Sequence, residues 1–142
     1  MTIAAILQHK GHEVVRLSPD VTLKDAAALL MENRIGCVPV CEGDEVVGIF
    51  SERDVVRSVG AKGPAVLDQP VRSEMTSPPV TVASDMHVLT ALSLMTQRRI
   101  RHLPVVENGR MIGLVSIGDL VKYRIEKIEA EAEAMREYIQ SA

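Results

Sequence analysis

Two short stretches carry the residue types most able to do chemistry. Residues 48–54 read GIFSERD and residues 113–119 read GLVSIGD, so each has Gly-x-x-Ser-x-x-Asp before an apolar run. A serine followed three residues later by a carboxylate is typical of a capped helix start. Such a start also favours phosphate, and an ionised Asp can accept two hydrogen bonds from a ribose diol. The pattern therefore predicts capping and is compatible with binding of a sugar phosphate.

Both stretches belong to a duplication. Residues 15–59 align without gaps on residues 80–124, at the offset that separates Gly48 from Gly113. Internal repeats should be recognised before a fold is assigned, and about 45 residues cannot build an adequate core alone. We expect two related units packed about a pseudo-twofold axis, with two similar clefts between them. The identical pairs include Asp20/Asp85, Arg34/Arg99, Ile35/Ile100, Pro39/Pro104, Val40/Val105, Ser51/Ser116 and Asp54/Asp119.

Each unit reads as strand, helix, two strands and helix, which predicts a mixed α/β (α+β) fold. The first strands are EVVRL at 13–17 and PVTVA at 79–83. The next two strands of each unit are separated by Gly-Asp at 43–44 and by Asn-Gly at 108–109, and the latter is a strong hairpin signal.

The helix after each first strand has apolar residues at i, i+3, i+4 and i+7, which gives it one buried face. Thr22 and Asp25 predict a capping box at the start of the first of these helices. The second has His87 in place of Thr22, so we expect a weaker cap or one shifted to Ser84 or Asp85.

Glycine and proline mark the expected boundaries between the parts of the chain. These parts are an N-terminal helical segment (1–12), the first repeat (13–59), a linker (60–78), the second repeat (79–125) and an extension of the last helix (126–142).

The last helix is expected to start at Ile117 or Gly118 and to end near Ile139. Its apolar residues recur at spacings of four and three, as in a short coiled coil, and charged residues flank them. The helix could pair with a second copy, which we favour, or fold back on its own core. The apolar residues are Val121, Ile125, Ile128, Ala132, Met135 and Ile139.

Composition excludes several classes of function. The chain has 142 residues, a formal net charge of −3 and three aromatic residues, which argues against a nucleic-acid binder. The N-terminal apolar run, Ile3 to Leu7, is too short to span a membrane or serve as a signal segment, so the cytoplasm is the expected compartment. A nucleophile elbow, a P-loop and metal-ligand spacing are all missing from the sequence, which argues against an enzyme.

Cys37 and Cys41 lie in CVPVC, which reads as a strand. Four residues along a strand span about 13 Å, beyond disulfide reach. We expect two reduced, mostly buried cysteines and no metal site.

The whole arrangement resembles a tandem pair of cystathionine β-synthase (CBS) domains, or Bateman module, standing alone. The resemblance covers roughly Glu13 to Tyr123 and rests on motifs that occur twice in the same order. These are the strands CVPV and HLPV, the stretches GIFSERD and GLVSIGD, and the entry EMTSPPVTV before the second repeat. It implies a regulatory module that binds an adenosine-containing ligand (AMP, ADP, ATP or NAD) in the clefts and signals to a protein partner, commonly as a homodimer.

The resemblance also implies roles for particular residues. Asp54 and Asp119 would hold ribose hydroxyls, and Ser51 and Ser116 would lie near ribose or phosphate. Strand residues with aliphatic side chains would line the adenine pocket, together with the first-strand residues at one aligned position. The implied adenine-pocket residues are Val38, Pro39, Leu103, Pro104, Arg16 and Thr81.

The two clefts are expected to differ. The second repeat has Arg101 and His102 at a strand entry where the first has Gly36 and Cys37, and a phosphate needs cationic or N–H donors. The cleft with Arg101 and His102 therefore looks better equipped, while Arg98 and Arg99 are expected on the surface. In the first repeat Arg53 and Arg16 could compensate, or that cleft could stay empty. A structural interaction module without ligand is the alternative reading of the whole chain.

Overall fold

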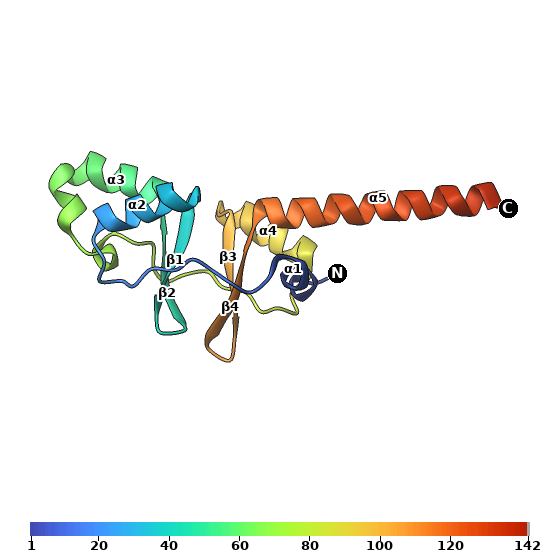
Figure 1. Cartoon of the computed structure of the whole chain (residues 1–142), viewed down its shortest axis with the longest axis horizontal. Helices are drawn as coiled ribbons and strands as arrows, with labels where there is room; N and C mark the ends of the chain where they lie inside the picture. The colour runs from blue at the N-terminus through green and yellow to red at the C-terminus, as the bar shows by residue number, and fades with distance from the viewer. Residues whose placement is uncertain (142) are drawn as a thin grey trace.

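The computed structural model describes residues 1–141 as two similar halves with a helix that projects from one of them (Figure 1). The elements in chain order are α1 (Ile3–Lys10), α2 (Leu23–Asn33), β1 (Cys37–Glu42), β2 (Glu45–Ser51), α3 (Glu52–Lys62), the 3₁₀ helices η1 (Pro64–Asp68) and η2 (Val71–Ser73), α4 (Val88–Arg98), β3 (His102–Glu107), β4 (Arg110–Ser116) and α5 (Ile117–Ser141).

The two antiparallel hairpins confirm the duplication at the level of single residues. Pro39 pairs with Ile49 in β1–β2, and Pro104 pairs with Leu114 in β3–β4. Each hairpin also has its register shift at the same place, after Val40 and after Val105. The hairpins lie side by side, with β2 in contact with β4, and α2 and α3 flank one while α4 and α5 flank the other (Figure 1). The expected arrangement of two repeats about a pseudo-twofold axis is confirmed.

The first strand predicted for each repeat is wrong in length. Only Leu17 and Val82 form bridges, parallel to Val40 and Val105 respectively. The reason lies in the prolines of the partner strands. Leu17 donates to the carbonyl of Pro39 and accepts from the N–H of Cys41, but the next ladder bond would need an N–H from Pro39, which proline lacks. The same limit holds at Pro104 in the second repeat.

The linker predicted at 60–78 is more ordered than its Gly and Pro content suggests. Helix α3 continues through Gly60 to Lys62, and two 3₁₀ helices follow. Val71 is fully buried in the first core, and its N–H donates to the carbonyl of Val21. The segment at residues 69–75 is therefore an integral part of the first repeat.

Helix α1 does the same for the second repeat. Ile3 is fully buried, and its N–H donates to the carbonyl of Met86, which aligns with Val21. Thr2 bridges His87 as Pro70 bridges Thr22. The N-terminal segment and the segment after η1 are thus structural equivalents that pack on different repeats.

The structure holds two apolar cores, one for each repeat. The core of the second repeat also contains three residues of α1, namely Ile3, Ile6 and Leu7. The core of the first repeat has Phe50 at its centre and includes Val66 and Val71 from the segment predicted as linker. Each repeat therefore has its own apolar core, and the two repeats meet at an interface between their hairpins.

Only some of the helix caps predicted from the sequence are present in the structure. Thr22 accepts a hydrogen bond from the N–H of Asp25, but the return bond that would complete a box is not formed. The weaker cap of α4 is confirmed, since His87 makes no side-chain cap bond. Ser84 does not replace it, because its hydroxyl and N–H both donate to Glu107.

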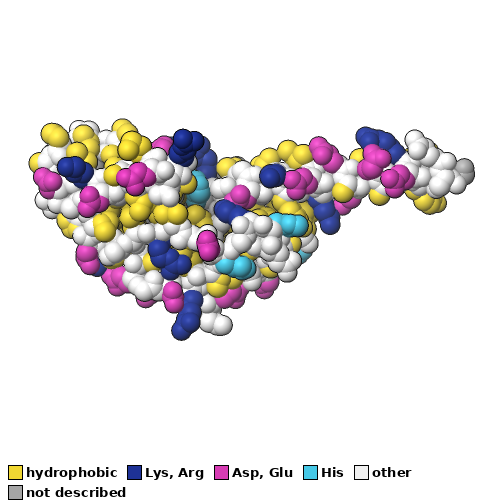
Figure 2. All heavy atoms as spheres, in the orientation of Figure 1, with side chains coloured by type: hydrophobic (Ala, Val, Ile, Leu, Met, Phe, Trp, Pro, Cys, Tyr) yellow, Lys and Arg dark blue, Asp and Glu magenta, His cyan; other side chains and the backbone are white. Residues whose placement is uncertain are grey.

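Helix α5 starts at Ile117 as predicted and extends away from the body (Figure 1). Beyond Arg124 every described residue except Ala132 is exposed, and the apolar side chains show on the surface of the projecting helix in Figure 2. The distal part therefore does not fold back on the core of its own chain.

Candidate functional site

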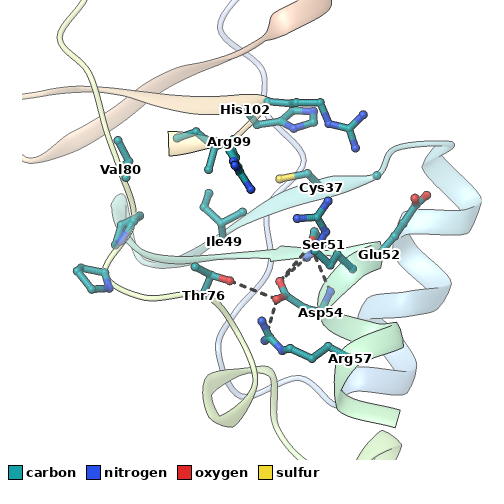
Figure 3. Close-up of a pocket in the computed structure, with 16 residues that line it drawn as sticks. Cys37, Ile49, Ser51, Glu52, Asp54, Arg57, Thr76, Val80, Arg99 and His102 are labelled. Atoms are coloured by element: carbon teal, nitrogen blue, oxygen red, sulfur yellow. Dashed lines mark hydrogen bonds and ion pairs between the residues drawn. The ribbon is translucent and has the colours of Figure 1, made fainter. Parts of the chain in front are cut away.

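A cavity of about 440 Å³ opens between the two repeats (Figure 3). One wall is the start of α3 with Ser51 and Asp54, and another is the segment from Thr76 to Val80. The third wall comes from the second repeat, from Arg99 to His102. Three separate parts of the chain thus meet at the interface between the repeats and form one site.

Asp54 lies at the bottom of this cavity with only 3% of its surface exposed. One carboxylate oxygen accepts from the backbone N–H of Ser51 at 2.9 Å and from its hydroxyl at 3.2 Å. The other oxygen accepts from the Thr76 hydroxyl at 3.2 Å and pairs with Arg57 at 2.9 Å. Because both oxygens are engaged, a buried negative charge is well compensated.

The partners of Asp54 are themselves held in place. Met75 packs directly against Gly48, where a Cβ would lie 2.5 Å from the Met75 sulfur. The Thr76 backbone then pairs with Ile49, with N–H to carbonyl distances of 2.9 Å in both directions. A glycine at position 48 is needed for this close approach.

An ion pair ties the same segment to α3. Glu74 is buried and binds Lys62 at 2.8 Å, and its carbonyl accepts from Arg57. The hydrogen bond from Lys62 is the largest influence on Glu74 and holds the pKa of that carboxyl below its usual range. Lys62 and Arg57 thus hold the segment that carries Thr76 against α3.

The wall from the second repeat is cationic. Arg99 ends α4 in the left-handed conformation, with φ of 54° and ψ of 43°, which turns the chain toward β3. Arg101 and His102 follow and face the same cavity, with His102 half-buried (Figure 3). Burial, and then the charges of Arg101 and Lys10, lower the pKa of His102 against an opposing effect of Asp119. The imidazole is therefore neutral at pH 7, and Arg99 and Arg101 carry the charge of this wall.

The equivalent position in the second repeat is filled differently. Ser116 and Asp119 form the same reciprocal cap, at 2.8 and 3.1 Å. The Nζ of Lys10 from α1 lies 2.6 Å from the Asp119 carboxylate and donates to the Leu114 carbonyl at 2.8 Å. Burial is the largest influence on Asp119 and raises its pKa. The bonds from Lys10 and Ser116 outweigh it, and the net pKa is lowered.

The structure brings together only some of the residues predicted for a site. Of the predicted residues, Ser51, Arg53, Asp54, Arg101 and His102 line the cavity, whereas Ser116 and Asp119 lie at the start of α5, where Lys10 pairs with Asp119. The adenine-pocket set does not line the cavity. Val38 and Leu103 are buried in the two cores, while Pro39 and Pro104 are buried beside them in β1 and β3, with Pro39 paired to the cavity-lining Ile49. Arg16 pairs with Asp44 beside the first hairpin turn, and Thr81 is exposed on the segment before α4.

Several lining residues are absent from the sequence prediction. Arg99 was expected on the surface only, but it borders the cavity. Thr76 and Arg57 contact Asp54 directly, and Ile49 and Val80 supply apolar surface. Arg57 could have been found from its i, i+3 spacing to Asp54. Thr76 belongs to the EMTSPPVTV stretch that carries the resemblance, but its contact with Asp54 spans 22 residues and cannot be read from local spacing.

Both cysteines are free and buried, as expected. Burial, and then the charge of Asp54, raise the pKa of Cys37 to about 12, so this thiol is un-ionised at neutral pH. Within residues 1–141 no group of three or more His, Cys, Asp and Glu side chains could hold a metal ion. None of the helices in the same range is long and apolar enough to cross a membrane.

Comparison with known proteins agrees with the fold. The family model of the CBS domain matches the chain twice, at residues 9–61 and 71–126. The chain belongs to the CBS domain family. Both matches include a Gly-x-x-Ser-x-x-Asp stretch, and the second begins at Val71, within the segment that the sequence assigned to a linker.

Several known proteins match most of this chain. A mitochondrial CBS domain-containing protein of Arabidopsis thaliana is 32% identical over 98% of this chain and 72% of its own length. The crystal structure of a CBS-domain containing protein from Agrobacterium tumefaciens is 41% identical, with a TM-score of 0.83 over 87% of this chain and 99% of that one. A CBS domain protein from Pyrobaculum aerophilum, solved in complex with AMP, is 30% identical with a TM-score of 0.74 over 84% and 89%.

Proposed function

We propose that this CBS pair is a regulatory module that binds an adenine nucleotide or dinucleotide in the cavity beside Asp54. The observation that carries the proposal is the composition of that cavity. It combines a carboxylate, which can accept hydrogen bonds from a ribose diol, with four arginines and a strip of aliphatic and proline side chains. A ligand with an apolar base, a diol and an anionic tail fits this set of groups.

The ribose would bind at Asp54, as the family resemblance implies. Its carboxylate oxygens already accept from Thr76 and Arg57, so a ribose diol must displace or share those bonds. The Thr76 hydroxyl can rotate toward the ligand, and Arg57 is more than half exposed. Ligand binding would therefore release Arg57 from Asp54, which links the ribose to the segment that Arg57 also contacts at Glu74.

The anionic tail would lie between the two repeats. The arginines are Arg53, Arg57, Arg99 and Arg101, and they exceed the two carboxylates of the cavity, Glu52 and Asp54. Arginine favours phosphate because its planar group can donate two parallel hydrogen bonds. Since these arginines come from both repeats, a phosphate held by them would join the two halves.

The base would lie against Ile49, Val80 and the prolines at 78–79, which supply most of the apolar lining. This pocket differs from the set predicted from the strands, of which Val38 and Leu103 belong to the two cores. The AMP found with the Pyrobaculum protein supports an adenosine ligand in this family, and the arginines favour AMP, ADP, ATP or NAD.

Signalling would follow from the position of the ligand. A ligand that contacts both repeats shifts the populations of their relative orientations by no more than its differential affinity for them. A protein partner that binds one orientation would read that shift. The proposed assembly is a homodimer with a regulated protein partner, and the cytoplasm remains the predicted compartment of this chain.

A structural interaction module without ligand is the second candidate. The observation in its favour is the full set of internal bonds on Asp54, which satisfies the site without any ligand. It predicts that no adenosine compound binds in a saturable way.

The two candidates are separated by a ligand screen on the full chain. Thermal unfolding is measured with adenosine, AMP, ADP, ATP and NAD, with inosine monophosphate as the matched control for the base, and each hit is titrated by calorimetry. The proposal expects saturable stabilisation by at least one adenine nucleotide and a smaller effect of the inosine compound. No stabilisation at millimolar concentrations would contradict it and favour the structural module.

A further inference from the structure

Helix α5 exposes a continuous apolar stripe that its own chain does not cover. The exposed fractions of Val121, Ile125, Ile128, Met135 and Ile139 range from 42% to 65%. Helices in proteins gain most of their stability from packing of an amphipathic face. A projecting helix with such a stripe therefore has an unused packing surface. We name these five residues with Ala132 the α5 seam.

The seam lies to one side of the face of α5 that packs on the second repeat. Leu120, the fully buried residue of α5, is one position before Val121 and therefore about 100° around the helix from it. Tyr123 packs against the core of the second repeat, and it lies two positions from both Val121 and Ile125. At about 100° per residue it is roughly 200° around the helix from each of them. A second helix can therefore lie along the seam without meeting the repeat that carries the first.

The spacing of the seam assigns its flanking positions. With Ile125, Ala132 and Ile139 at position a of a heptad and Val121, Ile128 and Met135 at d, the e positions are Lys122, Glu129 and Arg136. The g positions are Arg124, Glu131 and Tyr138. All six side chains are exposed except that of Arg124, which is half-buried.

These charges distinguish the two possible orientations of a self-pair. In a parallel pair each g residue faces the e residue five positions later on the other helix. Arg124 then faces Glu129 of the second copy, and Glu131 faces Arg136, so every charged contact is attractive. In an antiparallel pair e faces e and g faces g, and the register that overlaps the whole seam sets position 128 opposite position 132 of the second copy. Glu129 would face Glu129, Glu131 would face Glu131, and Lys122 would face Arg136, which is repulsive throughout.

We infer that the α5 seam is the homodimer interface and that two copies pair there in parallel. This inference rests on the homodimer of the proposed function and adds its surface and orientation. Parallel pairing about an axis along α5 places the two CBS pairs on opposite sides of the joined helices. Arg136 would then divide its charge between Glu133 of its own helix, at 2.9 Å, and Glu131 of the second copy.

The first test is the mass of the full chain in solution. Ile128→Glu with Met135→Glu puts two charges in the seam, and Ala130→Glu is the matched control because position 130 lies on the opposite face. The inference expects a dimer for the natural sequence and the control, and a monomer for the double variant. A monomeric natural sequence, or a dimer that survives the double variant, would overturn it.

The orientation is tested by cross-linking and charge exchange. Met135→Cys should form an intermolecular disulfide on mild oxidation, because parallel pairing brings the two positions 135 together. Arg124→Glu should weaken the dimer several-fold, and adding Glu129→Arg should restore it. A disulfide that forms only in a mixture of Ile125→Cys and Met135→Cys chains would show antiparallel pairing and overturn the orientation.

Nucleotide titration of the double variant separates this inference from the proposed function. No seam residue lines the cavity, so the monomer should bind an adenine nucleotide as the dimer does. Loss of nucleotide binding in every form would contradict the proposed function and leave the mass and disulfide results unaffected.

Discussion

Asp54 and Asp119 occupy the same place in two copies of one motif, but different groups meet them. Thr76 donates its hydroxyl to Asp54 and its backbone N–H to Ile49. At the equivalent place in the second repeat, the ammonium of Lys10 alone binds both Asp119 and the Leu114 carbonyl. The Asp54 carboxylate lines the cavity with both oxygens bonded and 4% of the side chain exposed, whereas the Asp119 carboxylate pairs with Lys10 and is 27% exposed.

The difference comes from the segments outside the aligned repeats. Met75 packs against Gly48 just as Leu7 packs against Gly113, so the two segments enter their repeats alike. After that point one continues as an extended chain through Thr76, while the other remains a helix to Lys10. The repeats supply two similar Ser-x-x-Asp helix starts, and the flanking segments bring different side chains to them, Thr76 to Asp54 and Lys10 to Asp119.

The largest effect is expected from glycine substitutions behind the two carboxylates. Gly48→Ala would place its Cβ 2.5 Å from the Met75 sulfur and 3.0 Å from the Thr76 carbonyl, so the cavity wall itself must move. We expect a loss of about 1–3 kcal/mol in unfolding free energy and weaker nucleotide binding by calorimetry. Gly113→Ala meets only side-chain atoms of Leu7 and should lower stability without changing nucleotide affinity. Equal losses of affinity in both variants would remove the distinction between the clefts.

A smaller effect is expected from the arginines. Arg101→Ala should weaken AMP binding about tenfold, because one hydrogen bond between charged groups is lost, and should leave adenosine binding unchanged. Arg16→Ala is the control, since Arg16 pairs with Asp44 outside the cavity. Calorimetry with both ligands measures the effect. If Arg16→Ala proved the more harmful change, the phosphate would belong elsewhere.

The covered cleft should respond to removal of its ammonium. Lys10→Met keeps the length of the side chain and frees Asp119, so we expect the number of nucleotides bound per chain to rise from one toward two. The stability change should stay below about 1 kcal/mol, because the ion pair is partly exposed. Lys24→Met, an exposed change on α2, should alter neither quantity. An unchanged stoichiometry in Lys10→Met would show that Lys10 does not exclude the ligand.

The smallest effect is expected on the pKa of His102. Burial, and then the charges of Arg101 and Lys10, lower this pKa, while Asp119 opposes them. The lowered pKa of His102 means that the unfolded chain binds more protons between that pKa and the ordinary value of about 6.5. Stability is therefore full above pH 6.5 and decreases as pH falls through this window. Nuclear magnetic resonance titration should show the pKa of His102 rising in Lys10→Met and unchanged in Lys24→Met. A His102 pKa unaffected by Lys10 would contradict the charge placement in the second cleft.

The sequence predicted the duplication, both hairpins, the Ser-x-x-Asp caps and the start of α5, because each depends on local spacing. It failed where a contact joins distant segments. The lengths of the first strands were overestimated because the prediction did not consider that the prolines of the partner strands lack a backbone N–H. The equivalence of residues 2–7 and 70–75 was missed because their offset differs from that of the aligned repeats.

The sequence named several residues of the candidate site but not how they meet, and it missed Arg57, Thr76 and Arg99. The lining residues that it named are Ser51, Arg53, Asp54, Arg101 and His102. Arg101 and His102 were assigned to the cleft of their own repeat, beside Asp119. Packing of the repeats also brings them to the cavity that Asp54 lines, while His102 remains paired with Ser116 in its own hairpin. Residue type and spacing indicate which side chains can bind a nucleotide, whereas the pairing of two repeats determines which of them share a cavity.

The most direct measurement is a calorimetric titration of AMP into the natural chain, Asp54→Asn and Asp119→Asn. An asparagine can still accept the capping hydrogen bond, so each variant removes charge from one cleft with little change in the helix start. Our account predicts one AMP per chain, affinity lowered about tenfold or more by Asp54→Asn, and little change with Asp119→Asn. Binding that survives Asp54→Asn and is lost in Asp119→Asn would contradict it and place the ligand in the cleft covered by Lys10.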